Sequence, residues 1–423
     1  MKVLMINKFF YIKGGSETYY FTLKTLLEQL GHQVIFFSMK DPHNYPSPYQ
    51  AYFVEGVDYN GKSSIPEQLK MASRIIYSKE AMRKLDALIA ETKPDIAHLH
   101  IFQHQMSPSI LAVLKKHRIP IVYTAHDLKM LCPNYKMLNR TGVCERCKGH
   151  HYYHCVQYRC IKDSMMKSMI CMLEGYLHLW LKSYDAIDAI ITPSRFYYDQ
   201  FLSAGIEPKR LHYLPNAMLD MQNEEVCTQN EEVCQANIHT LGTYYLYLGR
   251  ISSEKGILTM IQGMQDTGAT LYIAGTGPQE NEIKTYLAEQ KITNVTLLGF
   301  KQQPELQKIV LHAKAVIIPS EWYENSPYSG IEALSLGRIM IGAKIGGIPE
   351  LIQEGENGYL FPPGDAEAMR DCILNLEHRT ADERYHMQVS SRRLFETKFT
   401  QQIHYDAIET IYRNLSRQKE RDN

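Results

Sequence analysis

The sequence predicts an α/β protein built from two doubly wound parallel sheets. Short β-rich runs alternate with helical stretches through the first half of the chain, and the same alternation resumes after a polar interruption. Short apolar strands separated by helices are typical of parallel sheets that are covered on both faces. The length of 423 residues also exceeds what one ordinary core needs and indicates about two domains.

The expected elements follow from the apolar pattern and its flanking turn residues. Strands are predicted at Val3–Ile6, Val34–Phe37, Ile96–Leu99, Ile119–Tyr123, Ile187–Ile191, His212–Leu214, Tyr244–Leu248, Thr270–Ala274, Val295–Leu298, Val316–Ile318 and Ile339–Ile341. Helices are predicted at Glu17–Leu30, Ile257–Gln265, Gln279–Gln290, Pro304–Ala313, Pro327–Leu336 and Thr400–Leu415. Because ligands bind beyond the carboxyl ends of such strands, we expect a site in the cleft between the two halves.

These elements predict the domain boundaries. Residues 1–218 form the first domain, and the amphipathic end of the chain, 400–423, packs back on it. Residues 219–243 are a polar linker or loop insertion with the near-repeat NEEVC at 223–227 and 230–234, which is too short to stack as a solenoid. Residues 244–399 form the second domain.

The composition narrows the class of protein. Lys plus Arg and Asp plus Glu both number 46, which argues against a dedicated nucleic-acid binder. The start of the chain does not read as a signal peptide, and no run of about 18 apolar residues is present, so a cytoplasmic location is expected. The nine cysteines are then expected as thiols or metal ligands rather than as disulfides.

Two loops after predicted strands suit phosphate groups. Gly14 and Gly15 open a helix, where glycine lets the backbone approach an anion and Ser16 is the expected N-cap. Arg250 and Lys255 lie in a loop flanked by glycines, and such cations suit a diphosphate. No Asp-x-Asp motif stands out at a strand end, so these cations rather than a metal are expected to neutralise a leaving group. A plain strand-to-helix turn and a solvated helix start are the alternatives.

A third loop carries two carboxylates beside a helix start. Ser326 is the expected N-cap and Pro327 the first helical residue, so free amides would face an anion. Glu324 precedes this helix and Glu332 lies within it, where the two carboxylates suit a sugar hydroxyl and a ribose diol. The alternative is a decorated surface turn.

The E-x7-E spacing from Glu324 to Glu332, with Asn-Ser-Pro between, resembles the family-four retaining glycosyltransferases of GT-B fold. Further segments match the same family: Gly346–Leu351, Asn357–Phe361, Pro215-Asn216, Gly275–Pro278 and Gly299-Phe300. The resemblance implies two Rossmann-like domains that face a central cleft. One position departs from the family pattern, since Thr276 stands where an Asp is frequent.

The resemblance assigns roles to matched residues. It implies catalytic roles for His126, Glu324, Arg250 and Lys255. It implies donor binding by Gly14, Gly15, Gly275, Gly277, Phe300, Asn325, Ser326, Pro327, Tyr328 and Glu332. His100 and Asn216 are the acceptor-side candidates, and His98 and His104 compete with His126 for the active-site role.

The implied activity is retaining transfer of a hexosyl group from a nucleotide diphosphate-sugar to a glycan or lipid-linked acceptor, in surface polysaccharide or glycolipid biosynthesis. The resemblance also implies that no metal or other cofactor is required for catalysis. The alternatives are a GT-B sugar-nucleotide epimerase, a non-catalytic sugar-nucleotide-binding protein, and a metal-dependent interaction module.

The last alternative rests on a cysteine-rich insertion at about 130–162. Its candidate ligands for a structural zinc are Cys144, Cys147, Cys155 and Cys160, with a loop of reduced thiols as the alternative. The segment Met165–Trp180 follows and is rich in Met, Leu and Tyr. It predicts either a core helix or a face that contacts the membrane peripherally, which would place the protein at the inner face of the membrane.

Overall fold

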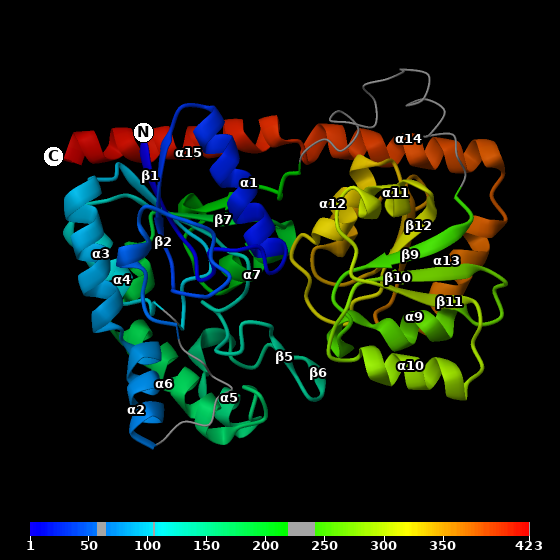
Figure 1. Cartoon of the computed structure of the whole chain (residues 1–423), viewed down its shortest axis with the longest axis horizontal. Coiled ribbons are helices and arrows are strands. Elements are labelled where there is room, and N and C mark those ends of the chain that lie inside the picture. Colours follow the sequence, from blue (N-terminus) through cyan, green and yellow to red (C-terminus); the bar gives the residue numbers. More distant parts are fainter. Residues whose placement is uncertain (57–64, 105, 219–241, 423) are drawn as a thin grey trace. The chain divides into compact units, whose positions relative to one another are not determined.

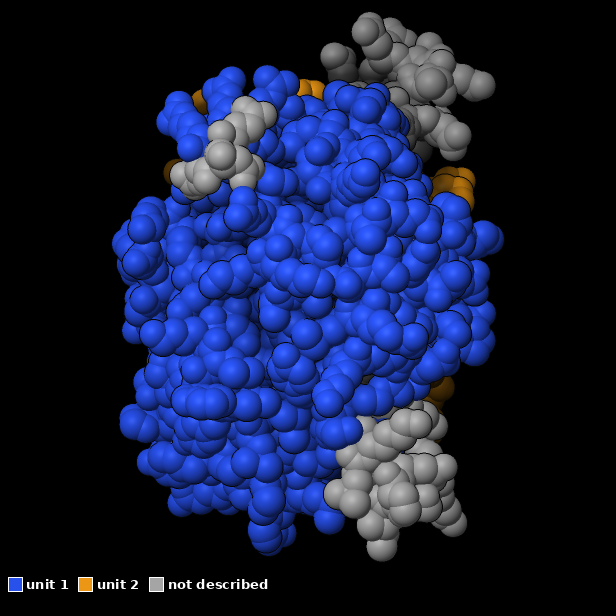
Figure 2. Space-filling view, turned by 90° about the vertical axis from the view of Figure 1, so that its left-hand side faces the viewer, with its two compact units in different colours: residues 1–214, 405–423 blue, residues 215–404 orange. Residues whose placement is uncertain are grey.

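The computed structural model describes residues 1–56, 65–104, 106–218 and 242–422. The chain divides into two compact units, residues 1–214 with 405–423, called unit 1, and residues 215–404, called unit 2 (Figure 2). The near-repeat at 223–234 and most of the expected linker lie outside the described residues.

Unit 1 is built on a six-stranded parallel sheet in the order β2-β1-β3-β4-β7-β8 (Figure 1). Its strands are β1 (Lys2–Ile6), β2 (Gln33–Phe37), β3 (Ile96–Leu99), β4 (Ile121–Thr124), β7 (Ala189–Thr192) and β8 (Leu211–Tyr213). Every residue of β3, β4 and β7 is buried, as expected for strands covered on both faces. A small antiparallel hairpin, β5 (Leu138–Asn139) and β6 (Gly142–Val143), lies in the insertion after β4.

The helices of unit 1 are α1 (Gly15–Gln29), α2 (Ile65–Ile76), α3 (Lys79–Thr92), α4 (Ile110–Lys116), α5 (Tyr153–Gln157), α6 (Met165–Trp180) and α7 (Arg195–Ser203). The last helix, α15 (Gln401–Asp422), belongs to unit 1 from Tyr405 onward. Its Tyr412 is fully buried and hydrogen-bonds with His98 of β3. This contact ties the end of the chain to the centre of the first sheet.

Unit 2 repeats the architecture with a six-stranded parallel sheet in the order β11-β10-β9-β12-β13-β14 (Figure 1). Its strands are β9 (Tyr244–Leu248), β10 (Thr270–Ala274), β11 (Val295–Gly299), β12 (Ala313–Ile318), β13 (Ile339–Ala343) and β14 (Gly358–Phe361). Its helices are α9 (Ile257–Met264), α10 (Glu280–Glu289), α11 (Glu305–Leu311), α12 (Tyr328–Ser335), α13 (Ala366–Glu377) and α14 (Ala381–Lys398).

Two helix starts differ from the prediction. Helix α1 has Gly14 as its N-cap, and helix α12 has Pro327, so the expected caps Ser16 and Ser326 are wrong. Neither cap residue offers a side-chain hydrogen bond. At α1 the Gly14 carbonyl accepts the first amides, from Glu17 and Thr18, at 3.1 and 3.0 Å. Both helix starts are therefore defined by backbone conformation rather than by a serine cap.

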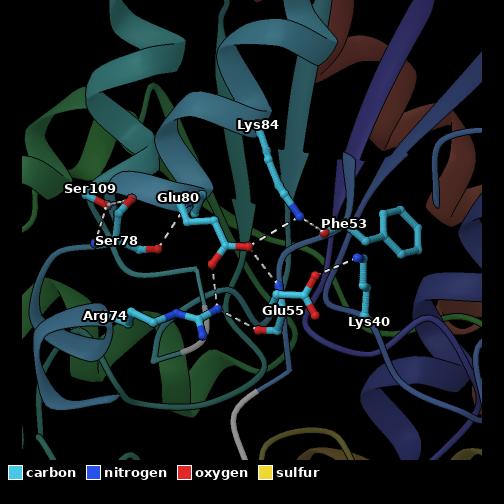
Figure 3. Close-up of polar contacts among 9 residues, drawn as sticks. Lys40, Phe53, Glu55, Arg74, Ser78, Glu80, Lys84 and Ser109 are labelled. Atoms are coloured by element: carbon cyan, nitrogen blue, oxygen red, sulfur yellow. Dashed lines mark hydrogen bonds and ion pairs between the residues drawn. The ribbon is translucent and has the colours of Figure 1, made fainter. Parts of the chain in front are cut away.

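A polar network joins α2 to α3 and to the loop after β2 (Figure 3). Glu80 pairs with Arg74 at 2.8 Å and accepts the Glu55 amide at 3.0 Å, while Arg74 also donates to the Glu55 carbonyl at 2.7 Å. Ser78 caps α3 by accepting the Ala81 amide. Burial alone would raise the pKa of Glu80, but the Glu55 amide and the Arg74 guanidinium hold it below its ordinary value.

Candidate active site

The carboxylate of Glu324 lies in the loop after β12, and its Oε1 collects hydrogen-bond donors from two loops. Lys255 Nζ is 2.6 Å away, Ser320 Oγ donates over 2.6 Å and Trp322 Nε1 donates over 2.9 Å. Among the described residues all these side-chain contacts converge on Oε1. A carboxylate has a second oxygen, so Glu324 keeps further capacity to accept hydroxyl groups.

Glu324 is ionised in this setting. Its side chain is buried, which alone would raise its pKa, but the Lys255 ammonium and the bonds from Lys255, Ser320 and Trp322 bring the pKa below the ordinary value. The same ammonium lies 5.3 Å from the centre of the Trp322 ring. The pair thus presents a fixed negative charge and a fixed positive charge at the carboxyl end of the second sheet.

Two glycines after β13 hold the backbone of Glu324. The Gly347 amide donates to the Glu324 carbonyl at 2.8 Å. Gly346 has φ of +58°, and a Cβ there would lie 2.3 Å from the same carbonyl oxygen. Glycine is therefore required at Gly346 both for its left-handed backbone and for the close approach of the two loops.

The glycines of the β10 loop have a structural reason of the same kind. A Cβ on Gly275 would lie 1.9 Å from the Gly249 carbonyl oxygen, and one on Gly277 would lie 2.1 Å from that of Ile251. The Gly275 amide in turn donates to the Gly299 carbonyl at 2.8 Å. These contacts stack the loops after β9, β10 and β11 at one edge of the sheet, so Gly275 and Gly277 shape the site through the backbone.

Glu332 is buried on α12 and has a different electrostatic state from Glu324. Its Oε1 accepts a hydrogen bond from Gln303 Nε2 at 2.9 Å. Burial raises the pKa of Glu332 to about 7, against a smaller lowering effect of the Gln303 bond. A ligand that donates hydroxyl groups to this carboxylate would favour its ionised form.

Other candidate residues of unit 2 lie in loops next to its strands. Arg250 is exposed after β9, and Phe300 is 68% exposed after β11. Asn216 donates to the Ser326 carbonyl at 3.1 Å, and its Oδ1 is buried without a hydrogen-bond partner among the described residues. The structure thus places Asn216, an expected acceptor-side residue, against the Glu324–Glu332 loop within unit 2.

In unit 1 the candidates His126 and His100 form one stack with His98. His100 Nδ1 lies 3.0 Å from His126 Nε2, and the ring centres are 5.3 Å apart; His98 stacks on the other side of His100 at 4.5 Å. His98 is held between Thr124 Oγ1 at 2.7 Å and Tyr412 of α15 at 2.6 Å. This chain of contacts runs from the C-terminal helix to His126.

His126 and His100 are neutral in this setting. Burial lowers the pKa of His126 to about 3. Burial is also the main reason why the pKa of His100 lies well below its ordinary value, and the repulsion that a protonated ring would meet from His98 and His126 adds to it. Since both rings are neutral, one of the facing nitrogens donates and the other accepts. A neutral His126 can exchange hydrogen bonds with a sugar hydroxyl but carries no charge for catalysis.

Three polar residues after β1 and at the start of α1 were not assigned a role from the sequence: Asn7, Lys8 and Glu17. Glu17 is buried, which raises its pKa, while hydrogen bonds from Ser16 and Asn7 oppose the rise. Burial and then the nearby Lys13 lower the pKa of Lys8 to about 8, although Glu17 and Asp127 act in the opposite direction. Lys8 and Asn7 directly follow β1. Their position at the carboxyl end of a parallel strand, where ligands bind, is the sequence feature that could have indicated them as site residues.

Comparison with known proteins identifies the family. The family model for group 1 glycosyl transferases matches residues 229–393, and the model for glycosyltransferase family 4 matches residues 13–218. The chain belongs to these glycosyltransferases. It is 31% identical over 182 residues to the amylovoran biosynthesis glycosyltransferase AmsK of Erwinia amylovora, and the matched segment covers 40% of this chain and 44% of AmsK. It is 25% identical over 326 residues to the sulfoquinovosyl transferase SQD2 of Arabidopsis thaliana, and the matched segment covers 74% of this chain and 53% of SQD2.

The chain spans about half the length of these curated relatives or less. Solved structures match it over nearly its whole length. Sucrose-phosphate synthase from Thermosynechococcus elongatus matches with a TM-score of 0.69 and 17% identity over 98% of both chains. HepE of Anabaena in complex with UDP and glucose matches with a TM-score of 0.62 and 16% identity over 97% of this chain and 99% of that one. At such identities the likeness shows the fold, which is GT-B.

The cysteine prediction needs a correction. Cys147 hydrogen-bonds with Cys132, which was not in the expected zinc set, and Cys155 hydrogen-bonds with Cys160. The thiols of Cys132, Cys147, Cys155 and Cys160 therefore form two hydrogen-bonded pairs that also interact electrostatically with each other. The set of Cys144, Cys147, Cys155 and Cys160 is not supported as a zinc site. In the described part of the chain, the one group of possible ligands close enough to share an ion is His104, Cys171 and Glu174.

A cation from the protein itself, the Lys129 ammonium, already lies beside this group. Lys129 Nζ lies 2.7 Å from Glu174 Oε2, and both side chains are buried. Burial alone would lower the pKa of Lys129, but Glu174 raises it above its ordinary value. The ammonium therefore supplies the positive charge that the buried carboxylate requires. We interpret this group as a buried ion pair that holds α6 to the loop after β4.

Proposed function

We propose that this chain is a retaining glycosyltransferase that moves a hexosyl group from a nucleotide diphosphate-sugar to a glycan or lipid-linked acceptor. The Lys255–Glu324 pair is the observation that carries the proposal. A cation and an ionised carboxylate 2.6 Å apart suit a ligand that presents phosphate oxygens next to sugar hydroxyls.

The donor contacts follow from the positions of the other residues. Arg250 and Lys255 would neutralise the diphosphate, while the backbone from Asn325 to Tyr328 would add amides. Glu332 would accept the ribose hydroxyls, and the exposed ring of Phe300 would border the base. UDP is the first nucleotide to test, because the structural neighbour HepE binds UDP and glucose.

The transfer step involves His126 and the leaving phosphate. The bond from the sugar C1 to the diphosphate oxygen breaks, and a bond from C1 to the acceptor oxygen forms. The acceptor proton passes to an oxygen of the leaving phosphate, so the charges balance without another base. Neutral His126 would position a hydroxyl of the transferred sugar, and the two cations would replace a metal at the leaving group.

The relatives supply the context for the product. AmsK acts in amylovoran biosynthesis, and WcaL of Escherichia coli is named a putative colanic acid biosynthesis glycosyltransferase. We therefore propose a role in surface polysaccharide or glycolipid assembly, with the enzyme in the cytoplasm at the inner face of the membrane. Among the described residues, no helix is both long and apolar enough to cross a membrane.

A thermal-shift screen of UDP, GDP and ADP and of their sugars tests the donor site. The wild-type protein should be stabilised by one nucleotide family, and Glu324→Gln should abolish transfer of the matching sugar while it keeps its fold. Retention is read from the anomeric configuration of the product by NMR, and metal independence from activity in excess EDTA. An epimerised sugar that remains attached to its nucleotide would overturn the transferase proposal in favour of an epimerase.

A further inference from the structure

Helix α6 exposes several large apolar side chains and buries three polar ones. The buried residues of this helix are Ser168, Cys171, Glu174 and His178. The large apolar side chains Met166, Met169, Leu173 and Trp180 are exposed by 64%, 44%, 47% and 78%. Their spacing of three, four and seven positions places them along one side of a helix. This arrangement is the reverse of an ordinary surface helix, which faces its apolar side to the core.

Polar contacts fix the helix in this orientation. Ser168 Oγ accepts the Ile161 amide at 3.1 Å, and Glu174 pairs with Lys129 at 2.7 Å. Among the described residues, His178 has Ser183 Oγ at 2.8 Å on one ring nitrogen and the Ile76 carbonyl at 2.8 Å on the other. Rotation of α6 to bury its methionines would break all of these bonds and expose a buried ion pair. The exposed apolar side is therefore a fixed feature of the fold.

The neighbours of α6 form a firm support. Gly175 lets the ring of Tyr152 pack against the helix, because a Cβ there would lie 2.9 Å from that ring. Helix α2 contacts α6, and the network of Arg74 and Glu80 anchors the end of α2 (Figure 3). Tyr153 on the adjacent α5 is 50% exposed and adds an aromatic side chain beside the helix.

Exposed lysines outnumber exposed acids along α6 and in the segments that flank it. Lys162, Lys167 and Lys182 are exposed before, within and after the helix. Helix α6 contains one carboxylate, Glu174, and it is buried and paired. Asp163 next to Lys162 forms an ion pair with Arg140, and Asp185 is the exposed acid that follows Lys182. A Met, Leu and Trp surface bordered by lysines has the chemistry of a helix that lies on an anionic bilayer.

We propose that Met166, Met169, Leu173 and Trp180, named here the α6 face, dock unit 1 on an anionic lipid surface. The helix would lie in the interfacial plane, with the apolar side chains among the lipid tails and the lysines at the headgroups. The proposal identifies the surface behind the membrane contact that the proposed function includes. Docking itself requires neither donor nor acceptor, so it can succeed or fail separately from catalysis.

Vesicle flotation of the full chain tests the α6 face. The wild-type protein should float with phosphatidylcholine vesicles that contain phosphatidylglycerol, and much less with phosphatidylcholine alone. Combined Met166→Ser, Leu173→Ser and Trp180→Ser changes should weaken binding about tenfold or more, and combined Lys167→Glu and Lys182→Glu changes should remove the preference for anionic lipid. Val389→Ser is the matched control, because Val389 is 42% exposed on α14 of unit 2.

Tryptophan emission provides a second measurement. The chain has two tryptophans, Trp180 and Trp322, so a Trp322→Phe variant reports on Trp180 alone. Its emission should shift to shorter wavelength when anionic vesicles are added. Unchanged emission, or equal flotation of the serine variant, would overturn the proposal. A wild-type oligomer that the serine changes dissociate, without vesicle binding, would assign the face to protein contact instead. Stabilisation by UDP in the serine variant shows that the donor site is intact.

Discussion

Lys255 Nζ lies 2.6 Å from Glu324 Oε1, although 69 positions separate the two residues in the chain. The pair joins the loop after β9 to the loop after β12, which are adjacent strands of the second sheet. In the ligand-free protein each charge offsets the other. A diphosphate would compete with Glu324 for the ammonium, so donor binding is expected to loosen this pair and release the carboxylate toward the sugar.

The first prediction concerns this ammonium. Lys255→Ala should lower kcat/KM roughly 100- to 1,000-fold, because one of the two cations at the leaving phosphate is lost. The pKa of Glu324 should rise at the same time, since its strongest opposing charge is removed. Steady-state kinetics with the nucleotide-sugar found in the screen measure the first effect.

Lys284→Ala is the control for Lys255→Ala. Lys284 is an exposed lysine of the same unit and forms an ion pair with Glu280 at 2.7 Å within α10. Its replacement should leave kcat/KM within a factor of about two, because exposed pairs of this kind contribute little. Equal losses in both variants would point to a general effect of charge and would remove Lys255 from the site.

The second prediction is a pH dependence from Glu332, whose pKa burial raises from 4.5 to about 7. A carboxylate with a raised pKa adds stability that is complete below about pH 4.5 and is lost as pH rises through about 7. Ionisation of the buried group then costs up to about 3 kcal/mol at pH 8. Glu332→Gln should therefore stabilise the ligand-free protein at pH 8 and leave it nearly unchanged at pH 4.5.

Urea unfolding at both pH values measures this difference. Glu332→Gln should also weaken UDP binding about tenfold, because an amide accepts fewer hydroxyl bonds than a carboxylate. A gain in stability with unchanged nucleotide affinity would leave Glu332 as a strained core residue outside the ribose site.

The sheets could be predicted from the sequence because buried parallel strands are short apolar runs. The predicted Tyr244–Leu248 and Thr270–Ala274 coincide with β9 and β10. Strand β14 was not predicted, since Gly358–Phe361 is short and begins with a glycine. Helix α6 was placed at Met165–Trp180, but its residue types could not show that the polar side faces inward, because that depends on partners such as Lys129.

The site could be predicted only in part for a related reason. Glu324, Lys255 and Glu332 belong to local motifs, so the sequence indicated their chemistry. The stack from His126 to Tyr412 joins residues from distant parts of the chain, and no local pattern contains it. The cysteines show the same limit, because Cys132 pairs with Cys147 across an intervening hairpin that spacing rules do not describe.

The third prediction concerns His126, whose pKa burial lowers to about 3. His126→Ala should reduce kcat by roughly 100-fold through loss of sugar positioning. The wild-type kcat/KM profile should show no histidine ionisation between about pH 5 and 9, because the ring is neutral throughout. His117→Ala is the control, since His117 is a partly exposed histidine of unit 1 that pairs with Asp86 at 2.7 Å. A histidine inflection near pH 6.5 that disappears in His126→Ala would contradict the neutral assignment.

The fourth prediction tests the stacked glycine loops. Gly275 has φ of +151°, and an added Cβ would lie 1.9 Å from the backbone oxygen of Gly249. Gly275→Ala should therefore destabilise unit 2 by about 3 kcal/mol or more, because a backbone atom cannot give way as a flexible side chain can. Gly268→Ala separates backbone strain from the clash: Gly268 has φ of +69° with nothing within 4 Å of the added Cβ, so about 1 kcal/mol is expected. Urea unfolding compares the two variants, and equal costs would mean that the loops after β9 and β10 move apart freely. Because the loop after β9 carries both Arg250 and Lys255, the larger loss at Gly275 should be accompanied by weaker stabilisation by UDP.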